Sequence, residues 1–193
     1  MSKSFITPLG RVSYPNLFKA KVDSFDSSKS YYSVDLIFPK SKDPKTCPLN
    51  SLRNEIEKAI KEKWPKRPPI LTLPIKDGDG LKPQAGTPYD EAYHGCWFIT
   101  LKNKRRPQVV DSQLRQITDE TLIYGGCYGH ASYQLYAYDN KGKKGISISL
   151  NNFQKVRDGE PFGGGGTQAE NEFEVQAEEA DNPANYGSNG GLY

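Results

Sequence analysis

The stretch YGGCYGHASYQLYAYDNKGKKGISISLNNF, residues 124–153, decides the fold that this sequence predicts. Its residues 133–138 alternate between two sets of side chains, and a period of two places successive residues on opposite faces of a β-strand. The segment DNKG, residues 139–142, has the composition of a tight hairpin turn. GISISLNNF, residues 145–153, alternates in the same way, so the stretch predicts a β-hairpin.

The sequence before this hairpin predicts further strands. KSFITPLGRVSYPNLF, residues 3–18, mixes β-formers with turn residues, and SYYSVDLIF, residues 30–38, alternates as a core strand does. GCWFITLKN, residues 95–103, and PQVVD, residues 107–111, add two more strands. Five or more short strands indicate a mostly β domain, and they suit a small barrel with loop insertions.

One segment has the pattern of a helix. Apolar side chains recur at helical spacing on one face of residues 50–64, with Lys and Glu on the other face. These apolar side chains are Leu52, Ile56, Ala59 and Ile60. Ser51 is the expected N-cap and Pro65 ends the helix. The stretch from Lys66 to Tyr93 is rich in Pro and Gly, so we expect a long irregular loop there.

Composition limits the class of protein. The chain has 193 residues, of which 35% are hydrophobic and 11% aromatic, with 12 Tyr. No apolar run approaches the roughly 20 residues of a transmembrane helix, and the N-terminus does not resemble a signal peptide, so we expect a soluble protein with no membrane contact. Three cysteines are too few for a disulfide framework, which favours a reducing cytoplasm.

Charge divides the chain into two parts. Residues 1–160 hold all 26 Lys and Arg and 17 Asp and Glu, a net charge of +9, whereas residues 161–193 hold only acidic charges. The six acids are Glu170, Glu172, Glu174, Glu178, Glu179 and Asp181. This second part opens with a run of Gly, has few apolar residues and ends on Leu192 and Tyr193, so we expect a disordered acidic tail after one folded domain. A basic domain with an acidic tail indicates a polyanionic partner, nucleic acid.

Two groups of side chains suit a single-stranded nucleic acid. Cations neutralise phosphates and aromatic rings stack bases without reading their sequence. The first group follows an aromatic strand and comprises Trp97, Lys102, Lys104, Arg105 and Arg106. The second comprises the hairpin tyrosines Tyr124, Tyr128, Tyr133, Tyr136 and Tyr138 with the tip lysines Lys141, Lys143 and Lys144. Strand aromatics are usually core and tip lysines usually solvated, so the interpretation depends on both groups occurring together with the tail.

Two kinds of metal site are alternatives to a nucleic-acid interface. Four soft side chains offer a zinc site, although their spacing is not that of a CxxC knuckle, and half-buried cysteines with strand histidines are the alternative. These four are His94, Cys96, Cys127 and His130. Four acids in the Pro- and Gly-rich loop offer a magnesium site for nuclease chemistry, although DGDG also forms tight turns. These acids are Asp77, Asp79, Asp90 and Glu91.

Enzyme sequence motifs are missing. The chain contains no GxxxxGK[ST], no HExxH and no GxSxG. We therefore expect a protein that is not an enzyme and has no cofactor.

Three segments resemble one family of phage single-stranded-DNA-binding proteins, formerly catalogued as a domain of unknown function. They are GRVSYPNLF at residues 10–18, GCWFITLKNKRRPQVVD at 95–111, and YGGCYGHASYQLYAYDNKGKKGISISLNNFQKVRDGEPFGG at 124–164. The resemblance implies an OB-fold, a five-stranded Greek-key barrel. It also implies a role in phage DNA replication, recombination and repair in the cytoplasm of an infected bacterium.

The same resemblance assigns roles to residues. It implies DNA contacts for the run from Lys102 to Arg106 and for the strand from Tyr133 to Tyr138. The family more often has a basic residue at the position of His130, which argues against zinc and suggests that His130 faces DNA. The tail resembles that of short-tailed coliphage binding proteins, which implies that it competes with DNA and recruits DNA polymerase and helicase.

The sequence thus predicts a sequence-tolerant single-stranded-DNA-binding protein. The alternative from another class is an adaptor whose tail and Pro-rich loop bind proteins, and a metal-dependent nuclease comes third. Both a monomer and a dimer are compatible with the sequence.

Overall fold

The computed structural model describes residues 4–23, 26–83, 85–140 and 142–162. All of them belong to one compact unit that spans Met1–Gly163. The predicted tail, with its six acids, Leu192 and Tyr193, lies outside the described residues, as does Lys141 of the hairpin tip.

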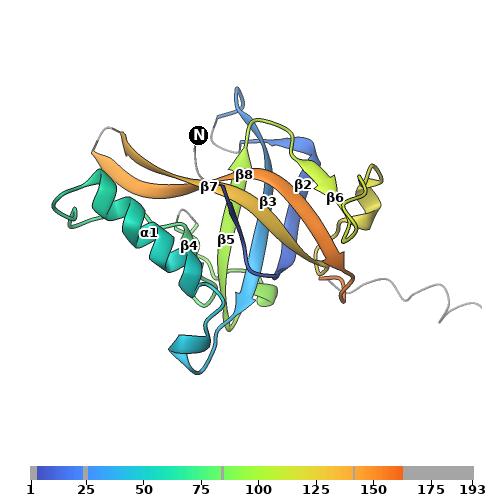
Figure 1. Cartoon of the computed structure of the whole chain (residues 1–193), viewed down its shortest axis with the longest axis horizontal. Helices are drawn as coiled ribbons and strands as arrows, with labels where there is room; N and C mark the ends of the chain where they lie inside the picture. Colours follow the sequence, from blue (N-terminus) through green and yellow to red (C-terminus); the bar gives the residue numbers. More distant parts are fainter. Residues whose placement is uncertain (1–3, 24–25, 84, 141, 163–193) are drawn as a thin grey trace, which may run out of the picture. The chain divides into compact units, whose positions relative to one another are not determined.

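Five strands close into a barrel (Figure 1). Around the ring, they are β2 (Gly10–Val22), β3 (Ser30–Pro39), β5 (Cys96–Asn103), β8 (Lys143–Arg157) and β7 (Tyr128–Asn140), and β7 pairs with β2. Within this ring, β5 pairs with β8 in parallel and the other pairings are antiparallel. A closed five-stranded barrel with one helix confirms the predicted OB-fold class.

The predicted hairpin is the longest paired segment. β7 and β8 pair from Tyr128 with Arg157 to Asn140 with Lys143. Gly142 has φ 81°, a left-handed conformation that glycine adopts without a steric penalty and that a two-residue hairpin turn requires. Figure 1 shows the tip of this hairpin reaching out from the barrel beside α1 (Asn50–Lys63).

Three short strands extend the barrel sheet. They are β1 (Phe5–Ile6) beside β7, β4 (Ile75–Asp77) beside β5, and β6 (Gln108–Val110) beside β8. β4 lies in the stretch expected to be an irregular loop, so that prediction was wrong for this part. Just before β4, Thr72 exchanges two backbone hydrogen bonds with β8: its N–H donates to the Lys144 carbonyl and its carbonyl accepts from Ile146, both at 3.0 Å. The segment from Thr72 to Asp77 therefore bridges β8 and β5.

The helix α1 packs on the barrel with its apolar face. Leu52, Ile56 and Ile60 are buried there, as the helical spacing predicts. The predicted N-cap was wrong: the cap residue is Leu49, which has no side-chain hydrogen-bonding group, and Ser51 lies inside the first turn. Three 3₁₀ turns complete the described structure: η1 (Pro44–Thr46), η2 (Glu91–Tyr93) and η3 (Glu120–Leu122). No helix among the described residues has the length and apolar character needed to cross a bilayer.

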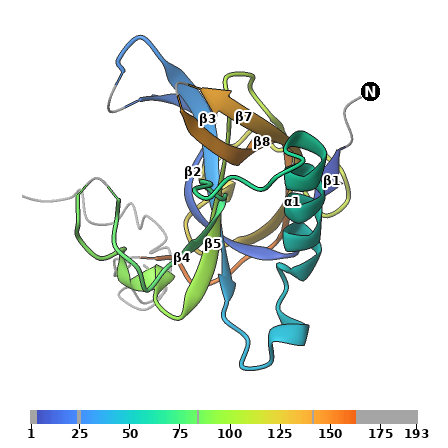
Figure 2. The ribbon, with the colours of Figure 1, turned by 90° about the vertical axis from the view of Figure 1, so that its left-hand side faces the viewer.

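Two apolar clusters stabilise this arrangement. The larger one fills the barrel and continues under α1. The smaller one consists of Ile37, Tyr93 and Phe98, with Tyr89 and Phe162 packed against it, and lies outside the barrel. Figure 2 shows α1 on one side of the barrel and the η2 turn, which supplies Tyr93, on the other side.

Candidate nucleic-acid interface

The outward positions of β3 and β5 form one surface because the alternate positions are buried. Val34, Leu36 and Phe38 of β3, and Ile99 and Leu101 of β5, have at most 1% of their surface exposed. The outward residues pair across the strands as Ser33 with Lys102, Asp35 with Thr100, and Ile37 with Phe98.

Two lysines bring positive charge to this surface. The Lys102 ammonium lies 5.0 Å from the centre of the Tyr31 ring. Lys76 of β4 lies over Phe98 at 5.3 Å, and its ammonium donates to the Thr100 hydroxyl at 3.4 Å. Partial burial lowers the pKa of Lys76, and the nearby charge of Lys102 lowers it further. A phosphate placed between the two lysines would offset both effects.

A buried carboxyl group lies below this surface. The Tyr93 hydroxyl donates to Asp35 at 2.8 Å, and the Thr100 side chain also hydrogen-bonds to Asp35. Burial raises the pKa of Asp35, although these hydrogen bonds and Lys76 act in the opposite direction. The Tyr93 ring meets Phe98 edge to face, with centroids 4.7 Å apart. The floor of the surface is therefore aromatic and hydrogen-bonded.

The surface continues onto the hairpin. Lys102 of β5 is in register with Ser149 of β8, and Ser147 lies on the same side because Ile148 between them is buried. Tyr136 pairs with Ser147 and is 49% exposed. One member of each predicted group, Lys102 of the basic group and Tyr136 of the tyrosine group, thus lies on this side of the barrel. We call the following set the outer face: Tyr31, Ser33, Lys76, Thr100, Lys102, Tyr136, Ser147 and Ser149. Phe98 is buried beneath Lys76.

The remaining tip and turn residues lie around the outer face. Tyr138 pairs with Gly145, and its hydroxyl is so close that a Cβ at position 145 would lie 2.6 Å from it. The Lys144 ammonium forms an ion pair with the Asp139 carboxylate at 3.0 Å, whereas Lys143 is exposed. The run Lys104, Arg105 and Arg106 forms an exposed turn directly after β5.

Two predicted residues have the opposite orientation. Trp97 is in phase with the buried Ile99 and packs against the main core, with the Lys40 and Arg53 cations 4.8 and 4.9 Å from its ring. Tyr133 is only 3% exposed and stacks on Phe5, and burial raises its pKa to about 12. Neither residue belongs to the outer face, so the predicted contacts of both with DNA bases lack geometric support.

Three other predicted residues lie at the base of the hairpin, away from its tip. The Tyr124 hydroxyl donates to Asp158 at 2.9 Å. The Arg157 guanidinium lies 3.7 Å from the centre of the Tyr128 ring. His130 Nδ1 is 2.8 Å from the Thr7 carbonyl oxygen. Each side chain has a partner within the fold, and the structure does not bring them to the outer face.

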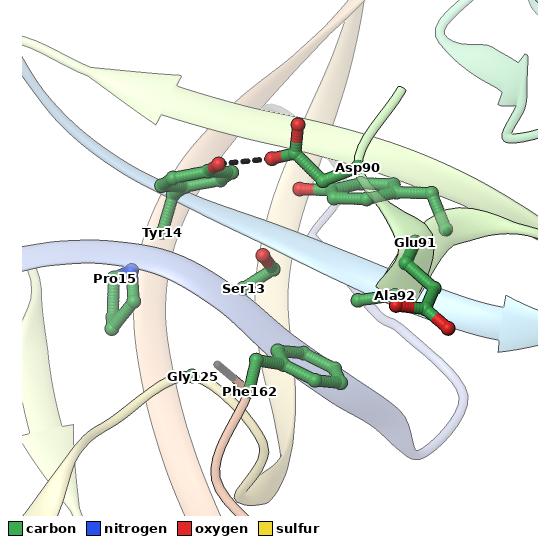
Figure 3. A pocket seen from close by; sticks show the side chains of 9 residues that line it. Ser13, Tyr14, Pro15, Asp90, Glu91, Ala92, Gly125 and Phe162 are labelled. Atoms are coloured by element: carbon green, nitrogen blue, oxygen red, sulfur yellow. Dashed lines mark hydrogen bonds between the residues drawn. The ribbon is translucent and has the colours of Figure 1, made fainter. Parts of the chain in front are cut away.

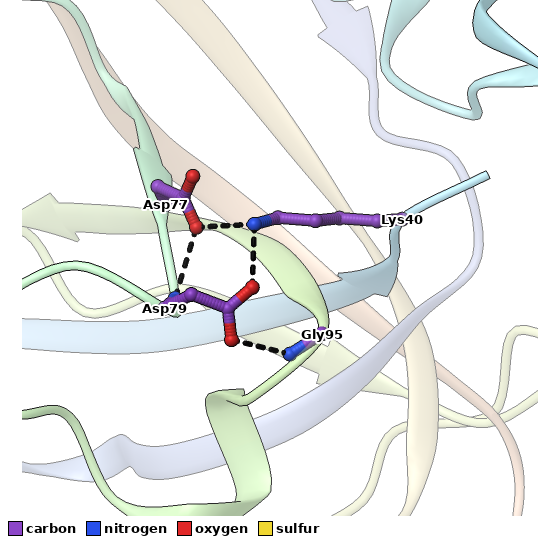
Figure 4. A network of polar contacts seen from close by, with 4 residues as sticks. All are labelled: Lys40, Asp77, Asp79 and Gly95. Carbon is purple, nitrogen blue, oxygen red and sulfur yellow. Dashed lines mark hydrogen bonds and ion pairs between the residues drawn. The ribbon is translucent and has the colours of Figure 1, made fainter. Parts of the chain in front are cut away.

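Three of the four acids predicted as a possible magnesium site are paired with lysines. Figure 4 shows Lys40 between Asp77 and Asp79, at 2.5 and 2.6 Å, while the Gly95 N–H donates to Asp79. These contacts lower the pKa of both carboxyl groups. Asp90 pairs with Lys82 at 3.0 Å. These ion pairs and this hydrogen bond connect the end of β3 to the end of β4 and to the start of β5.

The four soft side chains weighed as a zinc site do not come together. Cys127 is buried in the main core, whereas Cys96 packs against the smaller outer cluster. Burial raises the pKa of both thiols, which disfavours the thiolate that zinc binds. No three His, Cys, Asp or Glu side chains among the described residues form a group that could hold a metal.

Of the outer face, only Lys102 and Tyr136 belong to the predicted groups, and the residues that were not predicted include a lysine and a tyrosine. Lys76 lies in the stretch expected to be a loop, and only the pairing of β4 with β5 places it beside Phe98. Tyr31 could have been found, since the alternation that buries Val34 and Leu36 turns Tyr31 outward.

The barrel and its outer face define a class of protein. OB-fold proteins bind oligonucleotides and oligosaccharides across their second and third strands and at the loops beside them. In this chain, these strands are β3 and β5, and the cations and rings of the outer face lie there. The comparisons with known proteins agree: the chain belongs to the phage family described as "Enterobacter phage Enc34, ssDNA-binding protein", which matches residues 3–183.

Individual relatives support this assignment. Protein p50 of Acyrthosiphon pisum secondary endosymbiont phage 1 is 32% identical over 175 residues, which cover 85% of this chain and 89% of that protein. The single-stranded DNA-binding protein of bacteriophage Enc34, solved in complex with ssDNA, has a TM-score of 0.68 at 27% identity, covering 83% of this chain and 89% of that one. The bacteriophage T7 protein gp2.5 shares the fold, with a TM-score of 0.59 at 22% identity, covering 93% of this chain and all of that one.

Proposed function

We propose that this chain binds single-stranded DNA on its outer face, without strong sequence preference and without catalysis, in the cytoplasm of an infected bacterium. The observation that carries the proposal is the shared side of Lys102, Tyr31 and Tyr136 across β5, β3 and the hairpin. The Enc34 relative, which was solved with ssDNA, supports the choice of ligand.

The chemistry of the outer face fits a flexible polyanion. Lys76 and Lys102 neutralise phosphates and release counterions, so affinity falls as the salt concentration rises. Tyr136 offers an exposed ring for a base, and stacking contributes about 1–3 kcal/mol per base with any sequence. Lys104, Arg105, Arg106 and Lys143 lie exposed around the outer face and extend the path of the backbone.

The acidic tail is proposed to compete with DNA. Phe162 packs against the cluster of Ile37, Tyr93 and Phe98, and its N–H donates to the Gly125 carbonyl at 2.8 Å. Phe162, the last residue that the structure describes, therefore lies against the cluster beneath the outer face. Six acids tethered there at high local concentration would occupy the lysines when DNA is absent. DNA would then release the tail for partners such as a polymerase or helicase in phage replication, recombination or repair.

The test is fluorescence anisotropy of a labelled oligo(dT) of about 30 nucleotides across a salt series, with the duplex form beside it. The expected result is tight binding to the single strand with a steep salt dependence. Replacing Lys102 by Gln removes one phosphate contact and lowers the log–log salt slope by about 0.7. Tyr136→Ala is expected to weaken binding about tenfold with the slope unchanged, because stacking carries no charge.

Lys58→Gln is the matched control. Lys58 lies on α1, exposed and paired with Glu55 at 2.8 Å, on the helix that packs against the opposite side of the hairpin. Equal effects of the Lys58 and Lys102 substitutions would mean that the outer face is not the binding surface. Binding without salt dependence would instead favour the protein-adaptor alternative.

A further inference from the structure

A cleft of about 500 Å³ opens beside the outer face (Figure 3). Its walls come from the irregular part of β2, from η2, and from Phe162 at the end of the described chain. Tyr93 contributes to this cleft and also to the aromatic floor of the outer face. The volume lies within the roughly 300–1,000 Å³ of small-molecule sites, so the cleft can take one flat ligand group.

The backbone of Tyr14 is strained so that its ring borders this cleft. Tyr14 has φ 43°, which is rare for a bulky residue, and the β2–β3 pairing shifts register between Ser13 and Asn16. Its side chain is 57% exposed, and its hydroxyl donates to Asp90 across the mouth of the cleft (Figure 3). Strain of this kind costs about 1–3 kcal/mol and is concentrated at functional sites.

The charges at the cleft exclude a phosphate. No Lys or Arg is among the described residues that line it. Asp90 accepts from Tyr14 and pairs with Lys82, whereas the exposed Glu91 carboxylate has no hydrogen-bond or ion-pair partner within the described part of the chain. Arg11, behind the Phe162 ring at 4.1 Å, is held by the Gly126 and Glu160 carbonyls. The cleft therefore offers ring faces and one free anionic acceptor.

We propose that this cleft holds one unstacked nucleobase and prefers a base with an exocyclic amino group, such as cytosine. The inference rests on the proposed function, because the base must belong to a strand bound on the adjoining outer face. The aromatic walls accept the faces of the base, and Glu91 accepts a hydrogen bond from the amino group, as acidic side chains do from cytosine N4. Uracil presents a carbonyl oxygen at the same position, which Glu91 repels.

A lysine or arginine side chain of another protein would also fit the cleft, because its cation could contact the aromatic rings and pair with the Glu91 carboxylate. Two observations favour the base. Lys82 already neutralises Asp90, which leaves a single acceptor at the mouth, and Tyr93 connects the cleft directly to the outer face.

The test compares oligo(dC) with oligo(dU) of about 10 nucleotides, a length close to one OB-fold site. These bases differ only in their pairing edges, so stacking and the thymine methyl group do not confound the comparison. We expect the parent protein to bind oligo(dC) about tenfold more tightly than oligo(dU). Glu91→Gln should abolish this ratio, because an amide can also donate to the uracil carbonyl. Glu62→Gln, an exposed change on α1, should preserve it.

Each other outcome overturns the inference. Equal affinity of the parent for both oligonucleotides refutes the base preference and leaves the proposed function intact, whereas binding of neither removes both. A ratio that persists in Glu91→Gln places the preference elsewhere. Equal affinity together with a lysine-rich peptide that binds the parent but not Glu91→Gln would assign the cleft to a protein partner.

Discussion

The Tyr93 hydroxyl makes a hydrogen bond beneath the outer face that a single substitution can remove without removing the ring. It donates to Asp35 at 2.8 Å, while the Tyr93 ring keeps its edge contact with Phe98. Tyr93→Phe removes the hydroxyl and preserves the ring. A hydrogen bond to a charged group contributes about 1.5–3 kcal/mol, so we expect a loss of about 2 kcal/mol in the free energy of unfolding at a pH where Asp35 is ionised. For a domain of this size, that loss lowers the Tm by about 4–8 °C.

The loss should depend on pH in a defined direction. Burial raises the pKa of Asp35, so this carboxyl group becomes neutral at a higher pH than an ordinary aspartate. Once it is protonated, the Tyr93 bond is a neutral one and about half as strong, so the effect of Tyr93→Phe should shrink to about 1 kcal/mol in acid.

Thermal unfolding followed by circular dichroism at neutral and acid pH measures both values. Tyr136→Phe, at an exposed ring, is the matched control and should leave the Tm unchanged. A loss that does not become larger as the pH rises would refute the argument that this bond supports an ionised Asp35.

Three further predictions concern Asp35, Gly129 and the acidic tail. The stability of Asp35→Asn relative to the parent should increase as pH rises. Folding raises the pKa of Asp35, so the parent loses stability as pH rises above the pKa of this group in the unfolded chain, and the Asn variant does not. The difference in Tm between variant and parent across about pH 3–7 checks this sign. Gly129→Ala should cost about 1–3 kcal/mol, because its Cβ would lie 2.3 Å from the Phe153 ring and 2.5 Å from the Gln154 carbonyl; urea unfolding measures the loss, and an unchanged midpoint would contradict it. Deleting residues 163–193 should tighten oligo(dT) binding, most strongly at low salt where tail and lysines attract each other best, and an unchanged affinity in anisotropy titrations would refute competition by the tail.

Alternation of side chains predicted most of the barrel. The period of two in residues 30–38, 133–138 and 145–153 identified β3, β7 and β8 because each strand buries one face in the core. The same rule, applied further, separates Tyr136 from Tyr133: Tyr133 is in phase with Leu135 and Ala137, the side chains that pack against the core. The prediction placed both tyrosines in one group because they are the same residue type, although they point to opposite faces of the strand.

Other parts of the site have no local signal. The strand β4 is only three residues long and forms because β5 offers an unpaired edge, which a single-sequence pattern does not reveal. The cleft beside Tyr14 joins β2 to η2, elements about 75 residues apart in the chain. Its strained backbone depends on this long-range contact, so sequence alone could not predict it.

The segment from Thr72 to Asp77 has a consequence for motion. β5 and β8 pair directly at one position, Lys102 with Ser149, and the Asn103 side-chain amide donates to the Ser149 hydroxyl and the Leu150 carbonyl. Elsewhere the two strands are joined through the segment from Thr72 to Asp77. The junction is therefore where the barrel should open most readily, so its amides should exchange with solvent faster than those of the β7–β8 ladder. A strand lying across Lys102 and Tyr136 would bridge the junction from outside. Binding would then slow exchange at Thr72 and Ile146, residues that the ligand does not touch.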